Sequence, residues 1–316
     1  MSNKELPVIF LMGATATGKT DVATQLHRSL PVDVISVDSA MVYRGMDIGT
    51  AKPSAELLRE VPHRLIDICD PAESYSAAQF RTDALDAIGE ITVQGRIPLL
   101  VGGTGLYFRT LESGISELPA ADIQVRARLD REIREQGSAS LHRRLQAIDP
   151  ESARRIHPND PQRLQRALEV FELTGRSLSE HFRAARGQSL QRRIIKIILS
   201  PRDRETHRRI MGQRFQAMLD AGLMAEVQKL YARDDLHAGL PAMRMVGYRQ
   251  IWRYLDGQTA YDEMVNHAII ATQQLAKRQL TWLRKEQDYR EFIAEDAEIT
   301  AKVLKYIRER ASDAGM

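Results

Sequence analysis

Apolar runs alternate with amphipathic stretches along the first hundred residues of the chain. The runs are rich in Val, Ile and Leu, as is typical of strands buried on both faces, and they cover residues 8–12, 32–37, 64–69 and 97–101. Between them, residues 21–30 and 76–94 carry apolar side chains at the spacing of helices. This alternation predicts an α/β fold in which a parallel sheet is flanked by helices.

The pattern becomes helical from residue 118, and an apolar run at 192–199 then predicts a strand that returns to the sheet. We therefore expect the first part of a sheet domain at 1–117, a helical insertion at 118–190, and the return strand with C-terminal helices at 191–316. These last helices are expected at 203–221, 223–233, 248–255 and 259–285.

Charge is distributed unevenly between the insertion and the rest of the chain. Residues 118–190 contain 13 Lys/Arg against 10 Asp/Glu, whereas the remaining residues contain 32 of each. The whole net charge of +3 therefore lies in the insertion. This balance is compatible equally with a basic face that binds nucleic acid and with a solvated charged surface.

Cysteine content and hydropathy indicate the compartment. A single cysteine, Cys69, excludes an internal disulfide framework and fits a reducing cytoplasm. No run reaches the ~20 apolar residues of a membrane span, and the N-terminus lacks the core of a signal peptide. We expect a cytoplasmic protein without a membrane partner, and a monomer, since nothing in the sequence requires a dimer.

The stretch after the first apolar run, GATATGKT, matches the phosphate-binding loop pattern of Gly, four residues and Gly-Lys-Ser/Thr. Gly13 and Gly18 permit backbone angles that let N–H groups converge on an anion, and the next helix adds its positive end. Lys19 supplies a charge, and the Thr20 hydroxyl can bind a phosphate-bound Mg²⁺. The predicted diphosphate site comprises Gly13, Ala14, Thr15, Ala16, Thr17, Gly18, Lys19 and Thr20.

Polar residues follow three of the predicted strands. Asp38, Asp70 and Thr104 each come after an apolar run. Because the carboxyl ends of parallel strands meet at one edge of a sheet, we expect all three near the phosphate loop.

Six motifs in this order resemble the tRNA dimethylallyltransferase family, also called tRNA isopentenyltransferases. They are GATATGKT (13–20), DSAMVYRGMDIGTAKP (38–53), GGTGLY (102–107), DPQRLQRALE (160–169), RMVGYR (244–249) and AKRQLTWLRK (276–285). The resemblance covers residues 8 to about 285. The departures from the family pattern, at Ala14, Thr17 and 39–42, remove neither a charge nor a glycine, so the implied activity stands.

The resemblance implies transfer of a dimethylallyl group from dimethylallyl diphosphate to the N6 amine of the adenine immediately 3′ of the anticodon (position 37) in tRNAs, with Mg²⁺ as cofactor. It implies Asp38 as the general base and Lys19 and Thr104 as further catalytic residues. Mg²⁺ ligation and capping of the following turn stay open as roles of Asp38. Arg214, and less specifically Arg209, are the implied additional diphosphate ligands.

The implied macromolecular partner is the tRNA anticodon stem-loop. The residues that match the family's tRNA contacts are Asp38, Ser39, Ala40, Met41, Thr104, Arg126, Gln162, Arg163, Leu164, Gln165, Arg166, Arg244, Met245, Val246, Gly247, Tyr248, Arg249, Lys277, Arg278, Gln279, Leu280, Thr281, Trp282, Leu283 and Arg284. Taken singly, Trp252 and Trp282 are better explained as core residues of a helical layer.

Two other classes of function are compatible with parts of the sequence. A small-molecule kinase would bind ATP on the phosphate loop and use the arginine-rich insertion as a lid. The fourth apolar run, however, ends in GGTG, without the acidic Mg²⁺ ligand common in such kinases. An RNA-binding protein with a purely structural loop is disfavoured by the intact Lys19-Thr20 pair.

Overall fold

The computed structural model describes residues 6–116, 118–184 and 189–312 of the chain. The chain forms two compact units. Unit 1 comprises Met1–Phe108 and Gln191–Met316, and unit 2 comprises Arg109–Leu190. The insertion predicted at 118–190 falls within unit 2.

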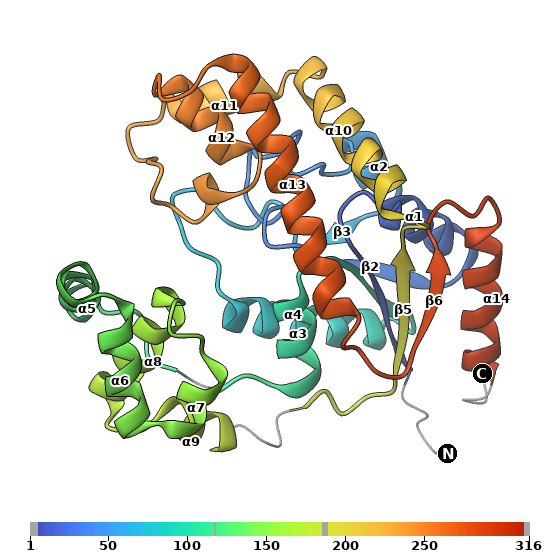
Figure 1. Ribbon diagram of the computed structural model, residues 1–316. Helices are drawn as coiled ribbons and strands as arrows, with labels where there is room; N and C mark the ends of the chain where they lie inside the picture. The colour runs from blue at the N-terminus through green and yellow to red at the C-terminus, as the bar shows by residue number, and fades with distance from the viewer. Residues whose placement is uncertain (1–5, 117, 185–188, 313–316) are drawn as a thin grey trace. The chain divides into compact units, whose positions relative to one another are not determined.

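Unit 1 is built on a parallel sheet with the strand order β3-β2-β4-β1-β5-β6. Figure 1 shows β5 and β6 of this sheet side by side. The strands are β1 (Val8–Gly13), β2 (Val32–Val37), β3 (His63–Arg64), β4 (Ile97–Gly102), β5 (Ile194–Ser200) and β6 (Tyr289–Ile293). In the register of β1 with its neighbours, Met12 lies opposite Gly102 of β4 and Ile198 of β5. The predicted return strand therefore joins the sheet beside β1, and the predicted α/β fold is confirmed.

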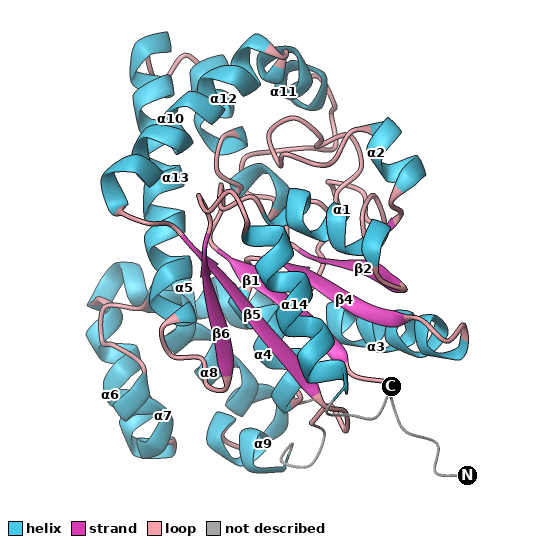
Figure 2. Cartoon of the chain, turned by 90° about the vertical axis from the view of Figure 1, so that its right-hand side faces the viewer, coloured by secondary structure: helices cyan, strands magenta, loops and turns pink. Residues whose placement is uncertain are grey.

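Helices cover both faces of this sheet, which explains why all six residues of β1 are buried (Figure 2). On one face, α1 (Lys19–Ser29) and α14 (Ile299–Ser312) place Leu26 and Val303 in one core cluster with Leu11. On the other face lie α3 (Ala77–Val93) and α4 (Gly105–Ser113), where the Phe10 and Phe108 ring centroids are 5.0 Å apart. The short α2 (Ala55–Glu60) precedes β3.

The C-terminal helices of unit 1 confirm the four predicted from the sequence. They are α10 (Arg204–Asp220), α11 (Leu223–Tyr231), α12 (Tyr248–Leu255) and α13 (Tyr261–Leu283), with a 3₁₀ turn η1 (Ala242–Arg244) before α12. Among the described residues, no helix combines the length and apolar character needed to cross a membrane.

The strand predicted at 64–69 is wrong beyond its first residue. Leu65 and Asp67 have φ values of 63° and 57°, which a strand excludes, so the chain leaves the sheet after Arg64. Cys69 retains only an isolated bridge to Tyr43. The sequence also gave no signal for β6, because four of its five residues are exposed and polar side chains interrupt its apolar ones.

The described part of unit 2 is helical. After the end of α4, its helices are α5 (Ile123–Gln136), α6 (Ser138–Ile148), α7 (Pro150–Arg155), α8 (Pro161–Thr174) and α9 (Leu178–Ala184). Local signals set their ends, since Asp149 and Asp160 cap α7 and α8 and each is followed by a proline. Leu129, Leu141 and Leu168 belong to a core cluster that lies wholly within this unit.

Candidate active site at the phosphate loop

The phosphate loop, residues 13–20, connects β1 to α1. Gly18 is the residue before α1 and has a φ of 69°, as predicted for a glycine that turns the chain. No side chain caps α1, so the N–H groups of its first turn can face an anion. A glycine is required at position 13 for a different reason, because a Cβ there would lie 2.6 Å from Thr17 Oγ1 and 2.8 Å from the Leu199 carbonyl oxygen.

Two side chains of the loop close it internally. The Thr17 hydroxyl donates to the Ala14 carbonyl at 2.9 Å, and Lys19 Nζ donates to the same oxygen at 2.6 Å. Lys19 thus lies folded over the loop, where an anion in the loop would compete for its ammonium group.

Two distant helices hold the loop from outside. Gln279 of α13 accepts the Thr15 N–H at 2.8 Å, and its amide nitrogen donates to the Gly103 carbonyl at 3.2 Å. His207 of α10 lies 2.8 Å from the Thr15 carbonyl oxygen through Nε2. Gln279, predicted as a tRNA contact, therefore joins the phosphate loop to the GGTG turn. The sequence carried no signal for His207, because its partner lies 192 residues away.

Three charged groups from separate segments act on one another at this loop. Burial lowers the pKa of Lys19 to about 8, the Asp38 carboxylate opposes this lowering, and Arg214 adds to it. Burial also lowers the pKa of Arg214, again against the charge of Asp38. The structure thus brings the two predicted diphosphate ligands, Lys19 and Arg214, near Asp38, the predicted base.

Arg209 lies apart from this group. It is exposed and donates to Gln213 at 3.3 Å, whereas Arg214 is half-buried. Five residues of helix separate the two arginines by about 140° around the α10 axis. His207, seven residues before Arg214, shares its side of the helix, so of the two arginines Arg214 is the one on the side of the phosphate loop.

Asp38 follows β2 directly, where Val37 lies opposite Gly102 of β4. Its Oδ1 accepts the N–H groups of Ala40 at 2.8 Å and Met41 at 3.3 Å, so this oxygen caps the following turn. Among the described residues, no hydrogen bond reaches Oδ2. Thr104 accepts the Ser39 N–H at 3.2 Å, which joins the GGTG turn to the start of the same loop.

The chemistry around Thr20 fits a phosphate-bound Mg²⁺. Its hydroxyl has no hydrogen-bond partner within the described ranges, and it stands in the first turn of α1. Mg²⁺ commonly takes one or two protein oxygens and completes its shell with phosphate oxygens and water. The described residues hold no cluster of three or more His, Cys, Asp or Glu side chains suited to a metal ion.

Asp70 does not join the site, contrary to the sequence-based expectation. β3 ends at Arg64, so Asp70 is not at the end of a strand. Its carboxylate accepts from Arg233 at 2.8 Å and from the Ala72 N–H at 2.9 Å. The hydrogen bond from Arg233 is the main cause that lowers the pKa of Asp70.

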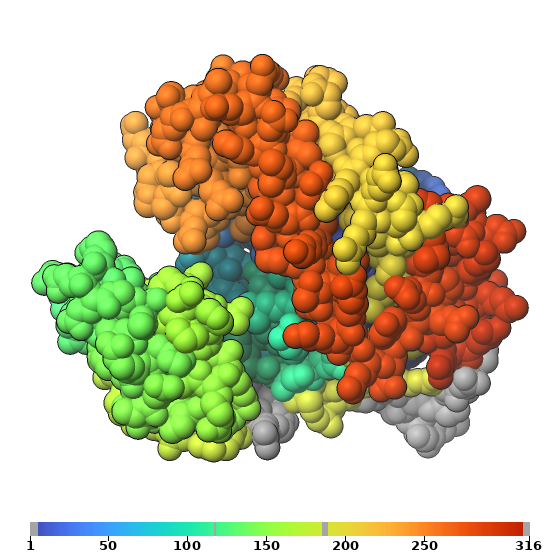
Figure 3. All heavy atoms as spheres, in the orientation of Figure 1, coloured from blue at the N-terminus to red at the C-terminus, as the bar shows by residue number. Residues whose placement is uncertain are grey.

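The candidate tRNA contacts of unit 1 divide into exposed and buried side chains. The exposed cations are Arg244, Arg249, Lys277, Arg278 and Arg284. Figure 3 shows part of the α13 surface (orange) uncovered, beside α10 (yellow). Tyr248 and Leu283 are buried, with 0% and 3% exposure, so their side chains serve packing and not direct RNA contact.

Trp252 fits the core position favoured for each tryptophan taken singly, whereas Trp282 is only partly buried. Trp252 is buried. The Trp282 indole packs against Gly105, where a Cβ would lie 2.4 Å from the ring. Its ring centroid is 6.2 Å from that of Phe108.

In unit 2, two of the predicted tRNA contacts share one buried acid. Glu169 has a fully buried side chain and accepts from Arg126 Nε at 2.8 Å and from Arg166 at 2.7 Å. Leu164 is buried as well, whereas Gln162 and Arg163 are exposed. Two arginines thus share the Glu169 carboxylate, while the exposed Arg163 pairs with Asp160, with Nε 3.3 Å from Oδ2.

Comparison with known proteins agrees with this geometry. The family described as IPP transferase matches residues 41–286, and the family described as isopentenyl transferase matches residues 6–68. A tRNA dimethylallyltransferase of Thioalkalivibrio sulfidiphilus is 60% identical over 278 residues, which is 88% of this chain and 87% of that protein. One of Alkalilimnicola ehrlichii is 63% identical over 282 residues, 89% of this chain and 88% of that protein.

A solved structure extends the similarity to the fold. The full-length tRNA isopentenylpyrophosphate transferase of Bacillus halodurans is 36% identical, with a TM-score of 0.69, over 98% of this chain and 96% of that one. The matched family model and relatives agree with the phosphate loop and the fold. The chain belongs to the IPP transferase family.

Proposed function

We propose that this protein transfers a dimethylallyl group from dimethylallyl diphosphate to the N6 amine of adenine 37, immediately 3′ of the anticodon in tRNAs, and releases diphosphate. One observation carries the chemistry. The Asp38 carboxylate acts electrostatically on both Lys19 and Arg214 of the phosphate-loop site, and no hydrogen bond from a described residue reaches its Oδ2. This arrangement supports a leaving-group site and a base at the same edge of the sheet.

The leaving group needs positive charge. As the allylic C–O bond breaks, its electron pair stays with the diphosphate, whose negative charge grows. The N–H groups of α1, Lys19 and Arg214 would stabilise that charge where it develops. Mg²⁺ held with the diphosphate at Thr20 would supply further neutralisation.

The acceptor needs a base. The adenine amine is a poor nucleophile because its lone pair is delocalised into the ring. The new C–N bond forms from that lone pair, and Asp38 Oδ2 would take the proton that N6 then loses. Since the amine is buried in a stacked anticodon loop, the adenine must first be extruded from its stack. The exposed cations, Arg244, Arg249 and Lys277 among them, would bind the RNA phosphates.

A small-molecule kinase is the weaker candidate. β4 runs into Gly103 and Thr104, with no acidic side chain for Mg²⁺ where it ends. The matched relatives are named as tRNA-modifying transferases. Transfer of phosphate from ATP to a small molecule, with no prenyl transfer to RNA, would support the kinase instead.

Single-turnover transfer to a tRNA with A37 tests the proposal, followed by mass analysis of the nucleosides. We expect prenylated adenosine from the unmodified protein, and none from a tRNA carrying G37. Asp38→Asn should bind the diphosphate nearly normally and lose about 10²- to 10⁴-fold in rate, as for removal of a general base. If raising Mg²⁺ restored the rate of Asp38→Asn, Asp38 would be a metal ligand and not the base.

A further inference from the structure

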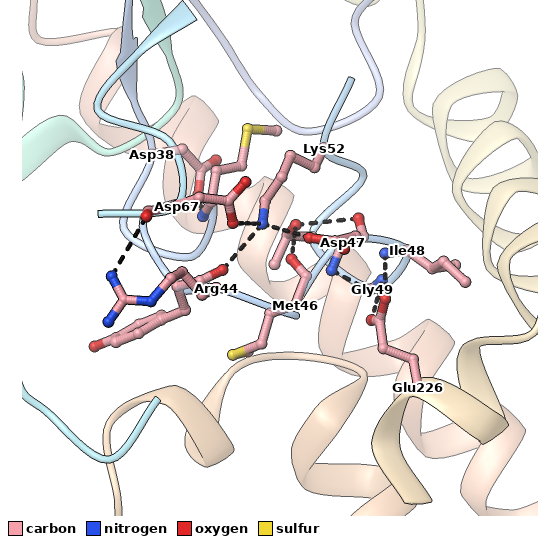
Figure 4. Close-up of polar contacts among 12 residues, drawn as sticks. Asp38, Arg44, Met46, Asp47, Ile48, Gly49, Lys52, Asp67 and Glu226 are labelled. Atoms are coloured by element: carbon pink, nitrogen blue, oxygen red, sulfur yellow. Dashed lines mark hydrogen bonds and ion pairs between the residues drawn. The ribbon is translucent and has the colours of Figure 1, made fainter. Parts of the chain in front are cut away.

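One carboxylate, Glu226 of α11, accepts hydrogen bonds from two distant parts of unit 1. Figure 4 shows those from residues 47–49. Its Oε2 accepts the N–H groups of Asp47 at 3.0 Å and Ile48 at 2.7 Å. Its Oε1 accepts the Gly49 N–H at 3.1 Å and the Tyr248 hydroxyl at 2.5 Å. We call these five residues the Glu226 cluster.

Three successive backbone N–H groups that point at one carboxylate form an anion-binding arrangement. In the Glu226 cluster the anion is a side chain 177 to 179 residues away in sequence. Hydrogen bonds to an ionised acceptor are about twice as strong as neutral ones. A glutamine at this position has a single acceptor oxygen, and its amide N–H groups would oppose the backbone donors.

Tyr248 closes the cluster from the other side. It is fully buried, and a Cβ on Gly49 would lie 2.6 Å from its ring. Burial and the bond to Glu226 raise the pKa of Tyr248, so its hydroxyl stays protonated and donates. Tyr248 lies between the exposed Arg244 and Arg249, and thus joins a candidate RNA-binding segment to the backbone at Gly49.

The Glu226 cluster holds the 38–53 loop, which begins with Asp38. Lys52, near the end of this loop, contacts two earlier residues of the loop and Asp67 beyond it, as Figure 4 shows. Its Nζ lies 2.5 Å from Asp47 Oδ1, 2.5 Å from Asp67 Oδ1 and 3.0 Å from the Tyr43 carbonyl oxygen. The Lys52 side chain is only 3% exposed, whereas the side chains of Asp47 and Asp67 are 59% and 43% exposed.

The middle of the loop packs into the helices that carry the cluster. Val42, Tyr43 and Met46 belong to one core cluster with Tyr248 and Val227. The loop, α11 and the start of α12 are therefore one packed body, and Asp38 lies where this body meets the sheet.

We propose that Glu226 is a positioning residue for Asp38: it holds the 38–53 loop so that the carboxylate meets the acceptor amine. This inference rests on the proposed function. Loss of the cluster leaves the phosphate loop intact, because Gln279 and His207 hold that loop independently. The effect should therefore fall on the rate of transfer and not on diphosphate binding. Misplacement of a reacting group by 1 Å can cost about 10²-fold in rate.

The test compares Glu226→Gln, Tyr248→Phe and a matched control, Glu263→Gln. Glu263 accepts one N–H, from Ala260 at 3.2 Å, and is exposed at the start of α13. We would measure single-turnover transfer with both substrates saturating, binding of dimethylallyl diphosphate, and hydrogen exchange of the amides of residues 47–49.

We expect Glu226→Gln to transfer about 10- to 100-fold more slowly, with diphosphate affinity within about twofold and faster exchange at 47–49. Tyr248→Phe should be slowed less, because the three backbone donors keep their acceptor. Glu263→Gln should keep the wild-type rate.

A wild-type rate in Glu226→Gln would overturn the proposal, whatever the exchange at 47–49. Equal losses of diphosphate binding and rate would also overturn it, since they indicate a general structural defect. Should Glu226→Gln not fold, Tyr248→Phe decides, and a wild-type rate there is decisive against Glu226. If the wild-type protein itself transfers nothing, the proposed function fails, and the role of Glu226 fails with it.

Discussion

Lys19 is less basic than an ordinary lysine because it is partly withdrawn from water and feels the charge of Arg214, and its basicity affects ligand binding. Its pKa is lowered to about 8, so it loses its proton just above neutral pH in the free protein. A diphosphate binds the charged form more tightly. Affinity should therefore be greatest below pH 8 and fall as the pH rises through it.

We expect the dissociation constant for dimethylallyl diphosphate to rise by up to about tenfold for each pH unit above 8. Titrations from pH 7 to 9.5 at constant free Mg²⁺ would measure this. Lys19→Ala should bind more weakly at all pH values and show no such trend. A wild-type affinity that stays constant to pH 9.5 would contradict the depressed pKa of Lys19.

Secondary-structure elements in unit 2 are joined through one buried acid. Glu169 on α8 accepts from Arg126 on α5 and from the Asp122 N–H, the cap of α5, at 2.9 Å. Arg166 adds a bond to the Pro119 carbonyl at 2.7 Å. Burial raises the pKa of Glu169, but the two arginines and the N–H outweigh it, so the pKa is lowered overall.

We expect Glu169→Gln to destabilise unit 2 by about 2 kcal/mol, less than the ~3–5 kcal/mol for a fully buried pair, because both arginines reach water. Since the pKa of Glu169 is lowered on folding, its contribution is complete above the ordinary value of 4.5 and is lost as the pH falls through the folded value. Hydrogen exchange of the α5 and α8 amides at pH 7 would measure the destabilisation caused by Glu169→Gln. The exposed Glu135→Gln, on α5, is the matched control, and equal protection in both variants would contradict the role of Glu169.

At the scale of the whole molecule, the chain consists of two units with separate cores. The unit 2 cluster around Leu141 and Leu168 contains no residue of unit 1. The Leu190 N–H donates to the Glu112 carbonyl at 3.0 Å, so the two ends of unit 2 are adjacent. A short linker can therefore replace residues 114–189 and leave α4 complete.

We expect this deletion to leave diphosphate affinity nearly unchanged and to weaken tRNA binding. The affinity of the full chain for tRNA should fall steeply with salt, because each neutralised phosphate contributes ~0.7–0.9 to the slope of log K against log salt. The deletion should make that slope less steep, in proportion to the number of phosphate contacts that unit 2 supplies. Equal slopes for the full and shortened chains would place the RNA-binding cations entirely in unit 1.

The sequence by itself determined the parallel sheet, the phosphate loop, the return strand and the position of Asp38. These follow from local patterns: an apolar run buried on both faces, a glycine at a turn, a polar residue directly after a strand. The failed strand at 64–69 shows the limit of such patterns. Its apolar residues suit a strand, but the positive φ values of Leu65 and Asp67 arise where the chain turns back toward Tyr43.

Only the tertiary structure decided which motif residues face outward and which hold the site together. Gln279 and Tyr248 lie in motifs matched to RNA contacts, yet one hydrogen-bonds the phosphate loop and the other is buried against Gly49. Glu226 lies in no motif at all. The physical reason is that burial and hydrogen-bond partners depend on segments brought together from 177 or more residues away, and no local pattern of residue types encodes that meeting.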